Sequence, residues 1–213
     1  MKLHVLNTGY FQLDGGAMFG VVPKTIWQKT NPADANNMCN WALRSLLIED
    51  GKRLILVDTG IGDKQSEKFF SHYHLHGSDS LHGNLARLGF HASDITDVIL
   101  THLHFDHCGG AIAFDTQKEA YRTVFANATY WSSENHWQWA TVPNPREKAS
   151  FLAGLGSGSA CRSIEGELVV WGKHENVVGS SDLLGIKFSE KIDPVFHHYQ
   201  DSILLDTLPD DLV

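Results

Sequence analysis

Four side chains of types that bind metal ions lie within six consecutive positions of this sequence: His102, His104, Asp106 and His107. On an extended segment, residues two apart point to the same side, so His102 and His104 can hold one metal ion together. A turn after them directs Asp106 and His107 towards a neighbouring position, where a second ion can bind. The pair Gly109-Gly110 lets the backbone fold tightly directly beyond these residues.

Imidazole and carboxylate groups together favour zinc, with iron, manganese or cobalt as further candidates. The chain has 13 histidines, and 8 of them lie between positions 72 and 107. A single histidine on a strand is usually an ordinary surface or core residue, but four ligand-type residues this close together are hard to explain in that way. The pattern therefore predicts a site for one or two metal ions, most simply zinc.

The string His-x-His-x-Asp-His at residues 102–107 resembles the signature of the metallo-β-lactamase superfamily. Residues 54–60, Leu-Ile-Leu-Val-Asp-Thr-Gly, resemble the strand and turn that precede this signature in the family. The general pattern is most similar to the small-molecule hydrolases that include the N-acyl-homoserine lactonases. There the aspartate at the position of Asp58 orients the metal-site loop by hydrogen bonding. The resemblance covers roughly residues 1–152, which we take as the metal-binding domain.

What this resemblance implies is an α/β fold, an αββα sandwich with the metal ions at one edge. A metal-bound hydroxide would attack the carbonyl of a small ester, lactone or amide, because metal binding lowers the pKa of water towards about 7. A metal would stabilise the oxyanion. Asp106 is then a candidate catalytic residue as well as a ligand. Two alternatives stay open: an iron-dependent oxidoreductase on the same scaffold, and a degenerate, inactive metal-binding domain.

The sequence departs from the family pattern downstream of the signature. A complete family site has three further ligands, including a histidine in a Gly-His-Thr or Gly-His-Ser turn, and neither tripeptide occurs here. The candidates are poorly spaced: His174, Asp182, His197 and His198. The Gly- and Ser-rich residues 154–160 are typical of a flexible linker. We therefore expect residues 153–213 to be a shortened or divergent second half of the domain, or an appendage.

A sheet that lacks its second half leaves apolar faces and strand edges uncovered, so we expect a homo-oligomer whose interface includes residues 153–213. The net charge of -8 argues against a nucleic-acid partner, and a small-molecule substrate is expected instead. No stretch approaches the roughly 20 apolar residues of a membrane span. The first residues are too short and polar for a secretory signal, and the 3 cysteines form no spacing motif. These features favour the cytoplasm.

Apolar patterning and turn signals predict alternating strands and helices, which favours a layered α/β architecture. Strands are expected at residues 2–7, 41–49, 53–57, 97–100, 123–126, 129–131, 167–171, 185–188 and 203–208. Helices are expected at residues 63–70, 78–88, 133–140 and 145–152. A Gly- and Pro-punctuated loop is expected over residues 14–37. The dipeptide Asp50-Gly51 predicts a hairpin turn.

Three other features have a structural and a functional interpretation. The segment 70–77 alternates histidine with apolar residues, and is an exposed edge, a substrate-entrance loop or a further metal-binding tract. Trp131, Trp137 and Trp139 are core residues or an apolar wall for an acyl substrate. Cys108 is a small buried side chain rather than a nucleophile.

Overall fold

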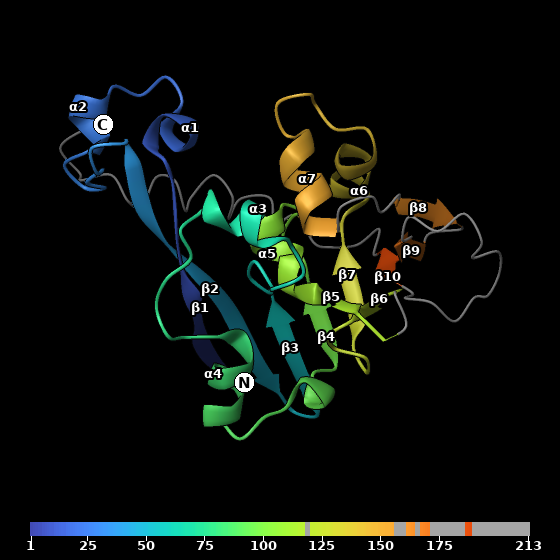
Figure 1. The fold of residues 1–213 in the computed structure, drawn as a ribbon. Helices are drawn as coiled ribbons and strands as arrows, with labels where there is room; N and C mark the ends of the chain where they lie inside the picture. Colours follow the sequence, from blue (N-terminus) through green and yellow to red (C-terminus); the bar gives the residue numbers. More distant parts are fainter. Residues whose placement is uncertain (118–119, 156–160, 165–166, 171–185, 189–213) are drawn as a thin grey trace.

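A computed structural model describes residues 1–117, 120–155, 161–164, 167–170 and 186–188 of the chain. Its main sheet has the strand order β1-β2-β3-β4-β7-β10-β9-β8 (Figure 1). These strands are β1 (Lys2–Asp14), β2 (Met38–Asp50), β3 (Arg53–Val57), β4 (Asp97–Ile99), β7 (Thr129–Ser132), β8 (Cys161–Ile164), β9 (Glu167–Val170) and β10 (Ile186–Phe188). A separate hairpin pairs β5 (Ile112–Asp115) with β6 (Ala120–Thr123).

The pairing changes direction across the main sheet. β1, β2 and β3 are antiparallel, and the turn at Asp50-Gly51 joins β2 to β3 as the sequence predicts, with a φ of 62° at Gly51. From β3 onwards the strands β3, β4 and β7 run parallel, connected through helical segments. The carboxyl ends of β3 and β4 therefore lie side by side at one edge of the sheet. The candidate ligand residues follow β4 at this edge.

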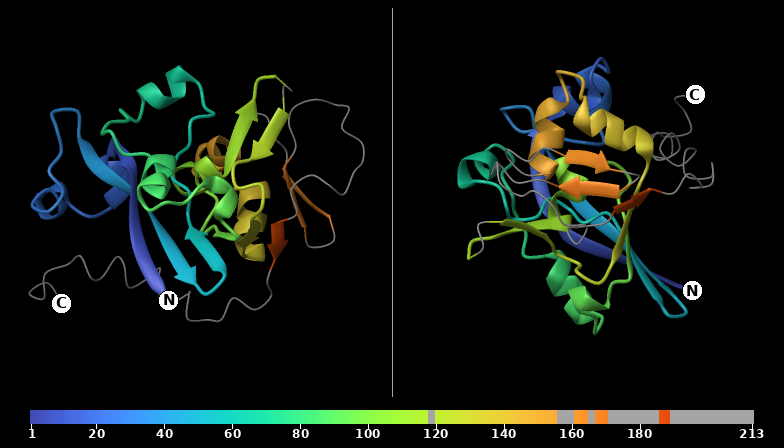
Figure 2. Two further views of the ribbon diagram at one scale, coloured as in Figure 1. Left: turned by 90° about the horizontal axis from the view of Figure 1, so that it is seen from below. Right: turned by 90° about the vertical axis from the view of Figure 1, so that its right-hand side faces the viewer.

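Short helices connect and flank the strands. They are α1 (Gly15–Phe19), α2 (Lys24–Trp27), α3 (Glu67–Ser71), α4 (Leu81–Arg87), α5 (Phe105–Cys108), α6 (Glu134–Thr141) and α7 (Lys148–Leu155), with 3₁₀ turns η1 (Ala92–Asp94) and η2 (Gly109–Ala111). Figure 2 shows β1 and β2 as a long ribbon, with α1 and α2 at one end and the N-terminus at the other. None of the helices in the described ranges is long and apolar enough to span a bilayer.

The core forms where α4 packs on the sheet. Leu81 and Leu85 of α4 lie in one cluster with Leu47 of β2, Leu56 of β3 and Val98 of β4. All of them are buried, and all but Leu81 are completely inaccessible to solvent. Leu81 and Leu85 are four positions apart, so they share one face of the helix. Burying a leucine in this way contributes about 1.5–3 kcal/mol to folding. The parallel pairing of β3 with β4 fixes their relative position, and this packing covers the strands on one side.

Several predicted elements have different limits in the structure. The loop expected over residues 14–37 contains α1 and α2, because the Asp14 carboxylate accepts the Ala17 N–H at 2.9 Å and begins a helix there. The helix expected at residues 63–70 begins only at Glu67, after the Ser66 hydroxyl cap. The strand expected at residues 123–126 is displaced, because the Phe125 N–H donates to the Tyr130 hydroxyl at 3.1 Å instead of to a strand. Residues 203–208 lie outside the described residues.

Candidate metal centre

All four candidate ligands lie just beyond the carboxyl end of β4. His102 and His104 occupy the connection that follows Leu100, and Asp106 and His107 lie on the short helix α5. Figure 1 shows α5 at the tips of the β3 and β4 arrows. Ligand sites of α/β sheets characteristically lie at this end of parallel strands.

The three imidazoles gather closely. The ring centroids of His102 and His107 are 3.9 Å apart, and those of His102 and His104 are 4.8 Å apart. The carboxylate Oδ2 of Asp106 lies 3.4 Å from Nε2 of His107. The structure thus brings all four residues together, as their spacing predicts.

Asp58 lies directly beneath this group, at the end of β3. Its Oδ1 accepts hydrogen bonds from the Thr101 N–H at 2.8 Å and the Thr101 hydroxyl at 3.0 Å. Its Oδ2 lies 2.8 Å from Nδ1 of His107, which donates to it. The backbone φ of Asp58 is 57°, in the left-handed region, and its side chain is buried. Asp58 therefore makes hydrogen bonds to the loop and to a candidate ligand imidazole, the contacts expected from its place in the sequence.

His107 lies between two carboxylates. Burial lowers the pKa of this imidazole, but the hydrogen bonds and charges of Asp106 and Asp58 outweigh it and raise the pKa to about 10. Since Nδ1 donates to Asp58, the other nitrogen, Nε2, faces Asp106. A divalent cation competes with the proton for such a nitrogen, because metal binding requires a deprotonated imidazole.

The other two imidazoles are neutral at physiological pH. Burial, followed by the nearby His107 and His104, lowers the pKa of His102 to about 4. Burial also lowers the pKa of His104, whose ring centroid lies 4.5 Å from that of Phe151 in α7. Neutral imidazoles are the form that coordinates metal ions. The apolar contact from α7 shields one side of His104.

The donor types fit a metal ion, although the set is not closed as it stands. Within the described ranges, no three His, Cys, Asp or Glu side chains are arranged so that together they would hold a metal ion. The downstream candidates His174, Asp182, His197 and His198 lie outside the described residues. The fit therefore rests on the neutral His102 and His104 and on the hydrogen bond that fixes the orientation of His107.

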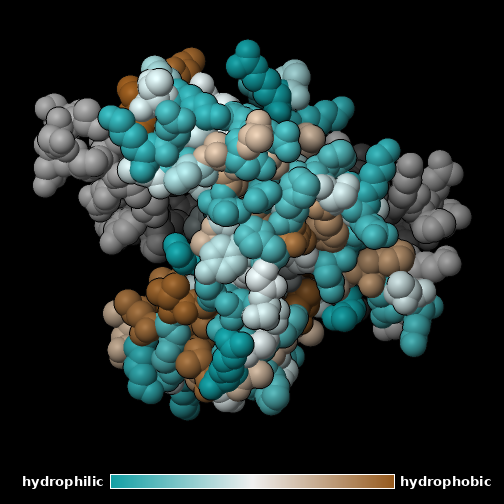
Figure 3. All heavy atoms as spheres, turned by 60° about the vertical axis from the view of Figure 1, so that its left-hand side comes forward, coloured by the Kyte–Doolittle hydropathy of each residue, from teal (hydrophilic) through white to brown (hydrophobic). Residues whose placement is uncertain are grey.

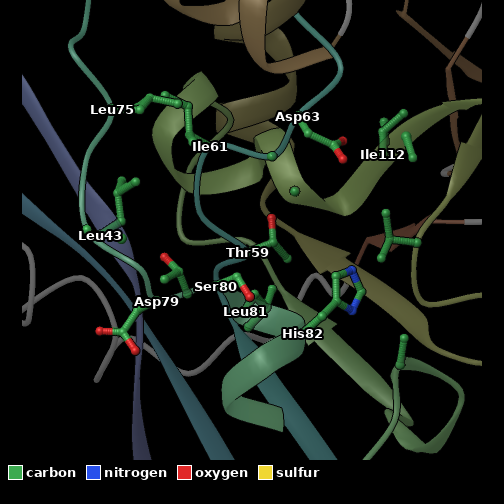
Figure 4. A pocket seen from close by; sticks show the side chains of 18 of the residues that line it. Leu43, Thr59, Ile61, Asp63, Leu75, Asp79, Ser80, Leu81, His82 and Ile112 are labelled. Atoms are coloured by element: carbon green, nitrogen blue, oxygen red, sulfur yellow. The ribbon is translucent and has the colours of Figure 1, made fainter. Parts of the chain in front are cut away.

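A cavity of about 590 Å³ lies beside residues 101–110, the segment that carries the candidate ligands and is called the metal-ligand loop below. Figure 4 shows Thr59 at its centre, with Leu43 and Ile61 on one side and His82 and Ile112 on the other. None of the four candidate ligands lines this cavity. The spacing of the four residues also predicts that they meet in one cleft, and this cavity does not test that prediction.

Several contacting residues were not predicted from the sequence. Thr101 donates to Asp58, and the Thr59 hydroxyl donates to the carbonyl oxygen of His107 at 3.0 Å. Each is next in the sequence to a predicted site residue, Thr101 to His102 and Thr59 to Asp58, so their position in the chain could have indicated a role at the site. Lys64, whose Nζ lies 2.6 Å from the carbonyl oxygen of Gly109, and Phe151 carry no such signal.

Residues 44–184 match the sequence model of the Metallo-beta-lactamase superfamily, which is more than half of the chain. The chain belongs to this superfamily. The matched range includes Asp58 and the whole His-x-His-x-Asp-His string, and the fold is the α/β fold of its hydrolases. The match also extends past residue 152, and the proposed boundary at residues 153–160 stays a prediction.

Solved structures agree with this assignment. A probable metal-dependent hydrolase from Staphylococcus aureus is 33% identical, with a TM-score of 0.64 over 70% of this chain and 53% of that one. The dizinc quorum-quenching lactonase AidC, in complex with a product, is 26% identical, with a TM-score of 0.51 over 71% of this chain and 52% of that one. The chain thus spans about half the length of these two structures. The hydrolase AbOPH, at 21% identity and a TM-score of 0.51, shares the fold.

Proposed function

We propose that this protein is a metal-dependent hydrolase that cleaves a small ester, lactone or amide. The observation that carries the proposal is the hydrogen bond from Nδ1 of His107 to Asp58, which turns Nε2 towards Asp106 beside His102 and His104. Histidines that bind metals commonly donate their other ring nitrogen to a carboxylate in this way. The lactonase among the similar structures carries two zinc ions, which supports zinc here.

In this proposal His102 and His104 would hold one ion, and Asp106 and His107 a second. A bound ion supplies a water of lowered pKa and polarises the carbonyl of the substrate. Asp58 keeps Nδ1 of His107 protonated and the ring oriented. Asp106, whose carboxylate faces the site, is the candidate catalytic residue. The buried, free thiols of Cys39 and Cys108 support a reducing cytoplasmic setting.

The test combines metal content with turnover. Purified protein is expected to contain zinc and to open an N-acyl-homoserine lactone, the substrate class suggested by the lactonase among the similar structures. The double variant His102→Ala/His104→Ala should lose metal and activity together. His91→Ala, at an exposed histidine outside the segments considered for metal or substrate, is the matched control and should retain both. Iron with no hydrolysis would favour the oxidoreductase instead.

A second candidate is a metal-binding domain without catalytic activity. It is favoured by the donor count in the described residues, since four ligands divided between two ions give each ion two. Catalytic zinc ions usually have roughly three protein ligands. Bound metal without turnover of any lactone, ester or amide tested would support this candidate over the hydrolase.

A further inference from the structure

Lys64 reaches from the segment after β3 into the metal-ligand loop. Its Nζ donates a hydrogen bond of 2.6 Å to the carbonyl oxygen of Gly109, directly after α5. The side chain is half-buried, and burial lowers the pKa of its ammonium group. Lysines are rarely withdrawn from water without a partner that compensates them. The carbonyl of Gly109 is that partner.

Backbone contacts also hold the segment after β3 close to the segment that contains α5. The carbonyl oxygen of His107 accepts from the Thr59 N–H at 2.8 Å, and the Gly110 N–H donates to Gly60 at 2.9 Å. A Cβ atom on Gly109 would lie 2.1 Å from the carbonyl oxygen of Ile61. Residues 59–64 therefore make backbone contacts at three positions of the opposite segment, His107, Gly109 and Gly110. Two side chains from outside the His-x-His-x-Asp-His string also contact this segment, the Thr59 hydroxyl at the His107 carbonyl and the Lys64 ammonium group at the Gly109 carbonyl.

We propose that Lys64 is a positioning residue of the metal site, which fixes the Gly109 carbonyl and thereby the orientation of α5 with Asp106 and His107. A cation at the last carbonyls of a helix also stabilises that helix end. Without this bond the C-terminal end of α5 loses one of the contacts that hold it, so Asp106 and His107 are positioned less accurately for an ion. The inference rests on the proposed function, because it concerns the same site.

The test uses cobalt(II) as the probe, because its visible absorption reports both affinity and coordination. Lys64→Met should lower cobalt affinity about tenfold, in the range seen when groups that support metal ligands are removed. The intensity of the cobalt bands should change as well. Lys64→Arg retains a donor and is expected to restore most of the affinity. Lys68→Met, at an exposed lysine nearby, should behave as the wild type does.

A merely structural role would lower stability without a specific effect on metal binding. Asp97→Asn provides that comparison, because Asp97 lies at the opposite end of β4 from the ligands. It is expected to lower stability while cobalt affinity and spectrum stay unchanged. If Lys64→Met does not fold, a wild-type spectrum and affinity in Lys64→Ala, which also lacks a side-chain donor, would overturn the proposal.

The outcomes separate this proposal from the proposed function. Wild-type protein that binds no cobalt overturns both. Wild-type protein that binds cobalt, with Lys64→Met of equal affinity and identical spectrum, overturns the positioning role alone. Reduced affinity in Lys64→Met with recovery in Lys64→Arg supports it, whether or not the wild type hydrolyses a lactone.

Discussion

Asp58 takes a backbone conformation that few residues adopt easily. Its φ of 57° is tolerated by aspartate better than by most side chains, and such conformations cost roughly 1–3 kcal/mol when found at functional sites. The compensation is visible in its contacts, since both carboxylate oxygens accept hydrogen bonds and its own N–H donates to Ile99 at 2.9 Å. One residue thus joins β3, β4 and α5.

Replacing Asp58 is expected to weaken metal binding without removing a ligand. In Asp58→Ala, His107 loses the acceptor that orients its ring, so metal affinity should fall roughly 10- to 100-fold. Competition titration with a chromophoric chelator measures this directly. Unchanged affinity would remove the positioning role of Asp58.

At the scale of single residues, the sequence was informative wherever a function depends on neighbours in the chain. The four ligand-type residues lie within one short segment, so their meeting follows from strand and turn geometry. Asp58 required the resemblance of residues 54–60 to the family, because 49 positions separate it from His107. Lys64 and Phe151 could not be predicted, since their contacts depend on tertiary packing alone.

At the scale of elements, the β3–α3 connection and the turn after α5 lie so close together that side chains do not fit between them. A Cβ atom on Gly110 would lie 2.2 Å from the carbonyl oxygen of Thr59. Gly110→Ala should therefore lower the free energy of unfolding by about 1–3 kcal/mol or more, because backbone must move. Urea unfolding monitored by circular dichroism measures the loss. A variant as stable as the wild type would show that this contact is loose.

Asp97 joins three adjacent strands at the other end of β4. It accepts hydrogen bonds from Arg53 of β3 at 3.2 Å, from the Thr96 hydroxyl at 2.7 Å and from Nε1 of Trp131 of β7 at 2.9 Å. Burial raises the pKa of Asp97, but the hydrogen bonds from Thr96, Arg53 and Trp131 outweigh it, and the net pKa is lowered. The ionised carboxylate is therefore stabilised by folding.

This gives Asp97→Asn a pH-dependent effect. A carboxyl group with a lowered folded pKa contributes stability that is complete above its unfolded pKa of about 3.9 and is lost as pH falls through the folded pKa. The variant should lose about 1–3 kcal/mol at pH 7, and the difference from wild type should shrink below about pH 4. Urea unfolding at several pH values tests this, and a constant difference down to pH 3 would contradict it.

Turn and capping residues explain which elements were predictable. Asp50-Gly51 fixed the β2–β3 hairpin, and Ser80 begins α4 within the helix expected at residues 78–88. The predicted limits were wrong where a side chain forms a hydrogen bond with the backbone and so decides where an element begins or ends. This happens at the helix caps formed by Asp14 and Ser66 and at the Tyr130 hydroxyl. Sequence periodicity does not report such competition.

At the scale of the whole molecule, one face of the β1–β2 ribbon is apolar and accessible. Leu3 and Val5 of β1 are 58% and 72% exposed, and their partners on β2 are Ile48 and Leu46. Directly paired residues share one face of a sheet. Figure 3 shows apolar side chains gathered on the lower part of the molecule, where the N-terminal end of β1 lies. Contiguous exposed apolar surface is typical of an association site.

We therefore propose that the protein self-associates, in line with the oligomer expected from the sequence. Light scattering after size exclusion should give a mass of at least two chains. Leu3→Lys/Val5→Lys should shift the protein towards a single chain, because charges are costly in an apolar contact. A single-chain mass for the wild type at every concentration tested would contradict the proposal. The expected contribution of residues 153–213 falls largely outside the described residues.

The hydrogen bonds between residues 59–64 and residues 107–110 also have a consequence for the order of folding. These bonds join Lys64 to Gly109 and Thr59 to His107, across 45 and 48 positions of the chain. Contacts between such distant segments form late, because the entropy of closing the intervening loop is lost before they contribute. The β2–β3 hairpin needs only a local turn and can form first. A metal ion bound at this loop would then act on a nearly finished fold, and it would slow unfolding far more than it speeds folding.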